Sequence, residues 1–229
     1  ESTEENRRFY REMLFTTHGL EDHISGVILF DETLRQSAAD GTPFSKILSD
    51  KGILPGIKVD KGLTPIPNTL GETVTQGLDG LSERLAEYSK LGAKFAKWRA
   101  VIQIGTHQPS QLSLALNAHS LARYAAICQS KGIVPIIEPE ILMTGSHTLD
   151  RCERAAQSTL DRVFEELTLQ QVFLEGMILK PSMVTPGDIC PEQVDPEIVA
   201  HSTIKIFKRS VPAAVPGIAF LSGGQSSTL

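Results

Sequence analysis

The sequence is poor in the residues that mark several common classes of protein. It has 3 cysteines in 229 residues, 1 tryptophan and an aromatic content of only 6%. Three widely spaced cysteines (Cys128, Cys152 and Cys190) do not suggest a disulfide framework and indicate reduced thiols inside a cell. We find no apolar run of membrane-spanning length, no signal peptide and no Asn-x-Ser/Thr site. These absences argue against a secreted or membrane-spanning protein.

Other absences reduce the range of possible functions. The 6 histidines are scattered, and neither a His-Glu-x-x-His nor a Cys-x-x-Cys motif occurs, so we expect no metal and no cofactor. The formal net charge of −5 argues against nucleic acid or a membrane surface as the main partner. The cytoplasm is the default location, and import into an organelle such as a glycosome stays open, because targeting signals lie at chain termini. Without repeats or a linker rich in Pro, Gly or Ser, we expect one domain over residues 1–229.

The chain does contain short apolar runs that alternate with amphipathic segments. This alternation predicts an α/β fold with parallel strands, either as an open doubly wound sheet or as a (β/α)₈ barrel. The longest predicted helix is capped by Ser110 and ends at Lys131-Gly132. A further helix is predicted from about Glu192 to Arg209, and residues 62–77 are predicted to form a loop. The predicted strands are Gly26–Phe30, Gly56–Asp60, Phe95–Ile104, Gly132–Leu142, Val172–Val184 and Val215–Leu221.

The position of a glycine-rich turn favours the barrel. In a doubly wound nucleotide-binding sheet the phosphate turn follows the first strand, whereas barrels place phosphate sites after strands seven and eight. Here Ser222-Gly223-Gly224 follows the last predicted strand. We therefore interpret the six predicted strands as strands two to seven of a TIM barrel. On this interpretation strand one precedes Glu1, strand eight follows Leu229, and residues 1–229 are a partial catalytic domain.

A lysine near the end of an apolar run is the most suggestive single residue. Lys180 follows Met177-Ile-Leu and precedes Pro181. Burial and nearby cations both favour a neutral amine, the form that attacks a carbonyl to make a Schiff base. The alternative is a lysine at a strand terminus whose ammonium extends to water.

Charged residues also stand at the ends of the neighbouring strands. They are spaced i, i+2, so both members of each pair face the same side of their strand. The pairs are Lys58 with Asp60, Lys97 with Arg99, and Glu138 with Glu140. At the carboxyl ends of barrel strands they would converge on one site. A purely structural ion-pair network across the barrel is the alternative.

These residue types suit a sugar bisphosphate. Lys97 would favour a neutral Lys180, and Glu138 could relay protons during imine formation. Ser222, Gly223 and Gly224 can offer backbone N–H groups to a phosphate, or form an ordinary turn. A second phosphate could bind Lys58 and Arg99.

Several motifs together resemble the class I fructose-1,6-bisphosphate aldolases, over essentially the whole chain. They are Glu5-Asn-Arg-Arg-Phe-Tyr10, Gly26-Val-Ile-Leu-Phe-Asp-Glu-Thr-Leu34, Gly56-Ile-Lys-Val-Asp-Lys-Gly62, Gly77-Leu-Asp-Gly-Leu-Ser-Glu-Arg84, Ala96-Lys-Trp-Arg99, Ile136-Ile-Glu-Pro-Glu-Ile141, Leu179-Lys-Pro181 and Phe220-Leu-Ser-Gly-Gly-Gln-Ser226. The resemblance implies a homotetrameric, metal-free lyase (EC 4.1.2.13) of glycolysis and gluconeogenesis. It splits fructose 1,6-bisphosphate into dihydroxyacetone phosphate and glyceraldehyde 3-phosphate.

The resemblance also implies roles for individual residues. Lys180 forms the Schiff base, Glu138 is the general acid/base with Glu140 close by, and Lys97 contacts substrate. The Leu-Ser-Gly-Gly turn (Ser222, Gly223, Gly224) holds the C1 phosphate. Lys58 and Arg99 face the C6 phosphate, and Arg7 matches another residue linked with substrate.

Three features of the family have no match in residues 1–229. These are an aspartate on the first strand, a phosphate-binding arginine from strand eight and a C-terminal tail that ends in tyrosine. We therefore expect the complete protein to be active and residues 1–229 alone to be inactive. Two other functions stay open at this point. One is a scaffolding role through actin or other proteins, and the other is Schiff-base cleavage of a different sugar phosphate.

Overall fold

The centre of the structure is a parallel sheet whose strands lie side by side in chain order. The computed structural model describes residues 2–221. The sheet order is β1-β2-β5-β6-β7, and every neighbouring pair is parallel. A doubly wound sheet reverses its order part-way across, so this sequential order is that of a (β/α)₈ barrel. The strands are β1 (Gly26–Leu29), β2 (Leu54–Lys58), β5 (Phe95–Ile102), β6 (Val134–Ile141) and β7 (Ile178–Leu179).

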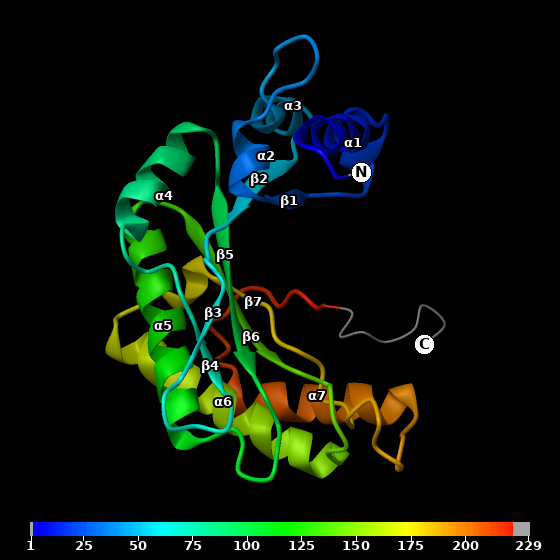
Figure 1. Ribbon diagram of the computed structural model, residues 1–229, viewed down its shortest axis with the longest axis vertical. Helices are drawn as coiled ribbons and strands as arrows, with labels where there is room; N and C mark the ends of the chain where they lie inside the picture. Colours follow the sequence, from blue (N-terminus) through cyan, green and yellow to red (C-terminus); the bar gives the residue numbers. More distant parts are fainter. Residues whose placement is uncertain (1, 222–229) are drawn as a thin grey trace.

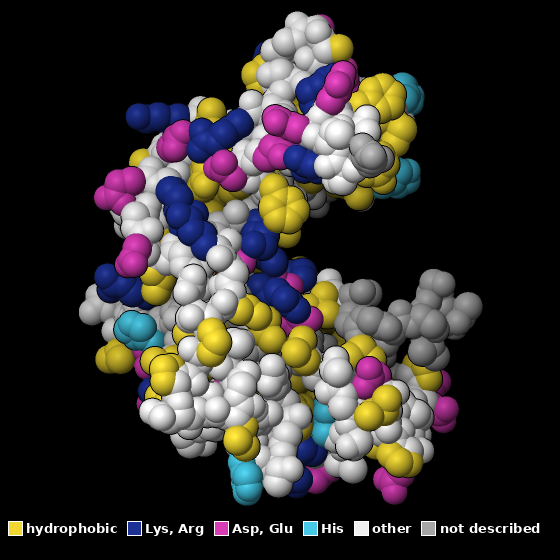
Figure 2. Space-filling view, viewed as in Figure 1, with side chains coloured by type: hydrophobic (Ala, Val, Ile, Leu, Met, Phe, Trp, Pro, Cys, Tyr) yellow, Lys and Arg dark blue, Asp and Glu magenta, His cyan; other side chains and the backbone are white. Residues whose placement is uncertain are grey.

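Helices follow the strands, and α4, α5 and α6 cover one face of the sheet (Figure 1). The space-filling view shows a hollow on the other side (Figure 2). None of the helices within residues 2–221 is both long and apolar enough to cross a membrane. The helices are α1 (Glu4–Thr16), α2 (Asp31–Arg35), α3 (Phe44–Asp50), α4 (Leu81–Lys90), α5 (Gln111–Ser130), α6 (Leu149–Leu169) and α7 (Pro196–Ser210), with 3-10 turns η1 (Leu20–Asp22) and η2 (Leu174–Gly176).

The two long helices begin at side-chain caps that the sequence supplies. Ser110 Oγ accepts a hydrogen bond from Ser113 N at 3.1 Å, which confirms the predicted start of α5. Thr148 Oγ1 caps α6 in the same way by accepting from Arg151 N at 3.3 Å. Such caps satisfy N–H groups that have no partner inside the helix. After α5 the chain turns at Gly132, whose φ of 68° is left-handed and favours glycine.

The outward face of β5 forms the centre of the core. Trp98 is fully buried and stacks on Tyr124 of α5, with ring centroids 5.5 Å apart. Trp98 therefore points outward, between sheet and helices. Because strand side chains alternate, its neighbours Lys97 and Arg99 must face the hollow instead.

On the inner face of the sheet, two glycines leave room for an aromatic ring. A Cβ added to Gly56 would overlap the ring of Phe95, and one added to Gly26 would lie 3.1 Å from it. The glycines of β1 and β2 therefore make room for Phe95, which lies two residues before Lys97 on the same face of β5.

The fifth predicted strand is shorter than the sequence suggested. Only Ile178 and Leu179 pair with β6, and part of the preceding segment forms the turn η2. The Gln129 side chain of α5 holds that turn. It accepts from Phe173 N at 2.9 Å and donates to Phe173 O at 2.7 Å. The prediction of strand from Val172 was wrong because this tertiary contact overrides the local β propensity.

Three other boundaries also differ from the predictions. Predicted strand Val215–Leu221 is reduced within the described residues to a single parallel bridge, Leu179 with Ile218. The predicted loop 62–77 contains an antiparallel hairpin, β3 (Leu63–Pro65) with β4 (Thr73–Thr75). Helix α7 begins at Pro196 rather than near Glu192, because proline is favoured in the first helical turn.

Candidate active site

A buried carboxylate shared by two lysines lies at the centre of the candidate site. Glu138 of β6 is 3% exposed, and its Oε1 accepts a hydrogen bond from Lys180 Nζ. Its other oxygen, Oε2, forms an ion pair with Lys97 Nζ at 2.6 Å. The structure thus brings together three of the four predicted catalytic residues. Buried charges are costly unless they are paired, and here each one has a partner of opposite sign.

Strand register explains why these three side chains meet. Ile137 pairs with Leu179, so Glu138 within β6 and Lys180 directly after β7 occupy neighbouring positions. On the other side Arg99 is the register partner of Glu138, and Lys97 lies two residues earlier. The same-face rule for alternate residues places Lys97, Arg99, Glu138 and Glu140 toward the hollow.

The charge count of this cluster has a chemical consequence. With both lysines protonated, Lys97, Lys180 and Glu138 together carry one net positive charge. Loss of one proton from an amine makes the group neutral and leaves a nucleophilic nitrogen beside a carboxyl group. Figure 2 shows basic and acidic side chains gathered in the hollow of the molecule.

The fourth predicted catalytic residue, Glu140, is bound to an arginine. Its Oε2 accepts a hydrogen bond from Arg99 Nε, and this bond raises the pKa of the Arg99 guanidinium above its ordinary value. Arg99 was predicted to bind phosphate. The Arg99 side chain is 38% exposed, so the guanidinium N–H groups that do not bind Glu140 can still reach a ligand.

The other predicted phosphate ligand, Lys58, lies at the end of β2. Its Nζ forms an ion pair with Asp60 Oδ1 at 2.7 Å and lies 5.8 Å from the centre of the Phe30 ring. Lys58, Asp60 and Phe30 line a pocket of about 430 Å³ at the carboxyl ends of β1 and β2. A cation held over an aromatic ring is stabilised without losing its charge. The predicted role of Lys58 in phosphate binding stays a prediction.

Arg7 lies apart from the lysine pair, on α1. Its guanidinium donates to both oxygens of Glu32, at 3.0 and 2.8 Å. Arg11 of the same helix donates to Glu32 Oε1 as well. The hydrogen bonds from Arg7 and Arg11 lower the pKa of the Glu32 carboxyl to about 2. The structure thus assigns Arg7 a protein partner, and the predicted link with substrate stays a prediction.

Two further observations concern the predicted phosphate turn and a possible metal. Ser222, Gly223 and Gly224 lie outside the described residues. No group of three or more His, Cys, Asp or Glu side chains within residues 2–221 is arranged to hold a metal ion.

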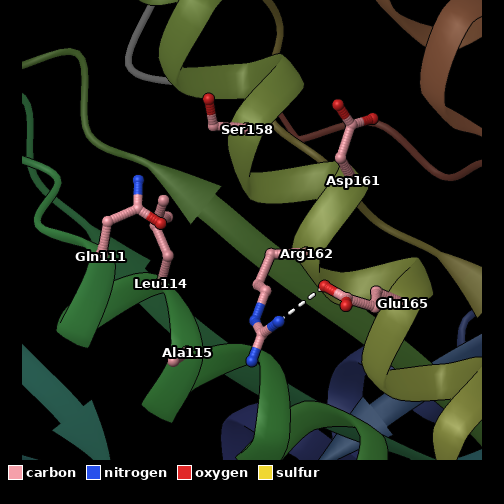
Figure 3. A pocket seen from close by; sticks show the side chains of 7 residues that line it. All are labelled: Gln111, Leu114, Ala115, Ser158, Asp161, Arg162 and Glu165. Atoms are coloured by element: carbon pink, nitrogen blue, oxygen red, sulfur yellow. Dashed lines mark hydrogen bonds and ion pairs between the residues drawn. The ribbon is translucent and has the colours of Figure 1, made fainter.

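A larger groove, of about 660 Å³, lies between α5 and α6 on the outer face (Figure 3). Its arginine, Arg162, points to Glu165 and forms an ion pair with it at 2.6 Å. The groove is lined by Gln111, Leu114, Ala115, Ser158, Asp161, Arg162 and Glu165. None of these is a predicted site residue, so the larger groove is separate from the candidate active site.

Sequence reasoning missed three contributors to this region. Phe30 lies near Lys58, Glu32 binds Arg7 and Arg11, and Ser182 Oγ accepts from Ile141 N at 2.9 Å. Each contact joins segments distant in sequence, so periodicity carries no signal for it. Ser182 alone could have been noticed, since it lies two residues after Lys180 and shares its side of an extended strand.

Comparison with known proteins gives a consistent result. A family model described as fructose-bisphosphate aldolase class-I matches residues 1–228. A probable fructose-bisphosphate aldolase class 1 of Xanthomonas campestris is 57% identical over 226 residues. Fructose-bisphosphate aldolase 6, cytosolic, of Arabidopsis thaliana is 54% identical. A Plasmodium falciparum fructose-bisphosphate aldolase, crystallised with TRAP and a small-molecule inhibitor, superposes with a TM-score of 0.96 at 51% identity.

These relatives are longer than the chain. The match covers 99% of this chain but 68% of the Xanthomonas protein and 63% of the Arabidopsis protein. For the Plasmodium structure it covers 98% of this chain and 65% of the other. The chain therefore spans about two thirds of the length of its relatives.

Proposed function

Because this chain belongs to the class I fructose-bisphosphate aldolase family, we propose that the full-length protein containing it is a metal-independent lyase that cleaves fructose 1,6-bisphosphate. The products are dihydroxyacetone phosphate and glyceraldehyde 3-phosphate, so the reaction serves glycolysis and, in reverse, gluconeogenesis. The observation that carries the proposal is the contact of Glu138 with both Lys180 and Lys97.

Imine formation follows from this geometry. The Lys180 ammonium first passes a proton to the Glu138 carboxylate. The resulting amine attacks the C2 carbonyl of the open-chain sugar, a C–N bond forms, and a proton moves from the nitrogen to the carbonyl oxygen, which becomes a hydroxyl. Glu138, in hydrogen-bond contact with Lys180, then donates a proton to that hydroxyl, which leaves as water. The positive charge of Lys97, 2.6 Å from Glu138, stabilises the negative charge that develops on the carboxylate as the proton leaves.

Cleavage uses the iminium ion as an electron sink. The C4 hydroxyl loses its proton, the C3–C4 bond breaks and the aldehyde departs. The bonding electrons move into the iminium and give an enamine on Lys180. Protonation at C3 and addition of water then release dihydroxyacetone phosphate and restore the amine. The family resemblance assigns the C3 proton transfer to a tyrosine that has no match in residues 1–229.

Two anion sites give the specificity for a bisphosphate. Backbone N–H groups of the Ser222, Gly223 and Gly224 turn would hold the C1 phosphate. Lys58 and Arg99 would face the C6 phosphate, and Arg7 would reach the substrate from α1. The exposed part of the Arg99 fork and the position of Lys58 in the 430 Å³ pocket support the second site.

The location and assembly of the full-length protein are part of the proposal. The cytosolic name of the Arabidopsis relative supports a cytoplasmic location. We propose a homotetramer, as is usual in the family. The Plasmodium relative, crystallised with TRAP, supports binding of other proteins as a second property. Light scattering on the purified protein tests the tetramer.

Trapping the covalent adduct tests the reaction. The full-length protein is incubated with dihydroxyacetone phosphate, reduced with borohydride and digested, and the adduct is located by mass spectrometry. We expect the adduct on Lys180, with no adduct and no turnover in Lys180→Met. Lys94→Met, which removes an exposed amine directly before β5, serves as the control and should keep both. A folded protein that forms no adduct on Lys180 would contradict the Schiff-base mechanism.

A further inference from the structure

The strand that carries Lys180 loses its regular hydrogen bonds at that residue. Lys180 N donates to Ile137 O of β6 at 2.8 Å. In a regular parallel ladder the next bond would run from residue 139 N to Lys180 O. Residue 139 is Pro139, which has no N–H to donate. The ladder between β6 and β7 is therefore interrupted beside the lysine.

The other side of the same strand is interrupted as well. There Leu179 N donates to Gly217 O at 3.1 Å, and Ala219 N donates to Leu179 O at 2.8 Å. The following donor on this side would be residue 181, which is Pro181. Two prolines thus remove the ladder bonds on both sides of Lys180. Backbone pairing alone does not fix where the strand goes after the lysine.

A serine hydroxyl makes the next connection to β6. Ile141 N would reach Ser182 O in a regular ladder but donates instead to Ser182 Oγ, at 2.9 Å. Within residues 2–221 this is the first hydrogen bond between the two strands beyond the gap. Ile141 directly follows Glu140, and Ser182 is two residues from Lys180. The bond therefore joins the strand that carries the carboxylates to the strand that carries the amine.

We propose that Ser182 is a positioning residue for the reaction proposed above. Its hydroxyl takes the place of the Ser182 carbonyl as the acceptor for Ile141 N. It thereby restores a connection between the two strands beyond the gap at Pro139 and fixes the distance between Lys180 and Glu138. Proton transfer between an amine and a carboxyl group depends steeply on that distance, because both must stay within hydrogen-bond reach. This inference rests on the proposed function, in which Lys180 and Glu138 act together.

Other contacts hold the following loops, so loss of the hydroxyl should leave the fold intact. Gly187 N donates to His147 O at 2.8 Å, and Asp188 N donates to Met143 O at 2.8 Å. Val184 N donates to Thr203 Oγ1 of α7 at 2.8 Å. These bonds tie the loop after β7 to the loop after β6 and to a helix. They act farther along the chain and do not set the spacing at Lys180.

The test compares Ser182→Ala with Ser182→Thr in the full-length protein. We expect Ser182→Ala to lower kcat and the rate of borohydride-trapped imine formation by roughly ten- to hundredfold, with KM little changed. Ser182→Thr keeps the hydroxyl and should restore most of both rates. Amide hydrogen exchange at Ile141 should become faster in Ser182→Ala and stay slow in Ser182→Thr. The control is Ser120→Ala, which removes a hydroxyl that donates to Leu116 O at 2.8 Å within α5.

Two results would overturn the proposal. One is a Ser182→Ala protein whose kcat and trapping rate stay within twofold of the unmodified protein. The other is a loss of rate that Ser182→Thr does not restore. If Ser182→Ala fails to fold, Ser182→Cys replaces it, because its thiol has similar size and is a weak acceptor. The Lys180 adduct in the unmodified protein tests the reaction itself, so failure of the proposed function is seen separately.

Discussion

At the scale of single residues, the site depends on ion pairs between its buried charges. Glu138 is 3% exposed and would be strongly disfavoured there without Lys97 and Lys180. In the proposed mechanism the same three groups would provide the nucleophile, the proton donor and the compensating charge. The structural ion-pair network and the catalytic cluster, which the sequence left as alternatives, are here one set of contacts. Family membership decides in favour of an enzyme.

The low pKa of Glu32 leads to a prediction about acid stability. A carboxyl whose folded-state pKa is depressed stabilises the fold above its ordinary pKa, and this contribution is lost as pH falls through the depressed value. The Glu32 pKa is about 2, held there by Arg7 and Arg11. We expect the free energy of unfolding to differ between unmodified protein and Glu32→Gln by a constant amount near neutral pH. The difference should shrink from about pH 5 downward and approach zero only below pH 2, where Glu32 is protonated in the folded state as well.

Urea unfolding at a series of pH values measures this difference. In an Arg7→Gln/Arg11→Gln background it should nearly vanish at every pH, because the partners are gone. Arg8→Gln is the matched control, since Arg8 binds Glu12 at 2.7 Å rather than Glu32. A pH dependence that survives the double substitution would show that another group lowers the Glu32 pKa.

At the scale of elements, the packing of Phe95 over β2 gives a second prediction. A methyl group at Gly56 would overlap the Phe95 ring, although the Gly56 backbone itself is not left-handed. We expect Gly56→Ala to lower the free energy of unfolding by about 1–3 kcal/mol through overpacking. Denaturant titration measures it, with Gly217→Ala as the control because that position has open space.

A double substitution separates steric overlap from other causes. Gly56→Ala combined with Phe95→Leu should be less destabilised than the sum of the two single substitutions, because the smaller side chain leaves room for the methyl group. Additive effects would mean that Phe95 is not the obstacle.

Local signals in the sequence identified most elements, and tertiary contacts explain the exceptions. Helix α5 begins at Ser110 and ends before Gly132 as predicted, because its cap and stop are local. The turn η2 depends on Gln129, a residue of a different element, and so local propensity predicted strand there. The hairpin of β3 and β4 has short strands and a long connection, which leave little periodicity to detect.

At the scale of the whole molecule, the single tryptophan offers a test of the one-domain prediction. Trp98 is fully buried between β5 and α5, so its fluorescence reports on the central packing. We expect its emission to shift to longer wavelength on unfolding. In one cooperative domain this transition coincides with the loss of helical circular dichroism from all helices. Two separated transitions would show that part of the chain, such as α1 to α3, unfolds independently.

The sequence predicted which residues of the candidate site come together, because the ends of barrel strands converge. The barrel interpretation placed Lys97, Glu138, Glu140 and Lys180 together, and the structure shows their contacts. Which partner each charge selects was not predictable, because it depends on strand register and side-chain direction. Arg99 binds Glu140 rather than its register partner Glu138. Sequence reasoning missed Ser182 because its proposed role depends on the gap in backbone hydrogen bonding at Pro139, which has no N–H group.

The sequential strand order bears on how the chain is made. Each strand pairs with the strand that precedes it in the sheet, from β1 through β7. A chain that emerges from the ribosome amino end first can therefore add each new strand to a partner that is already available. No early strand has to wait for a distant one, except where the sheet would close. Until the sheet closes it has two open edges, and each added strand covers the growing one.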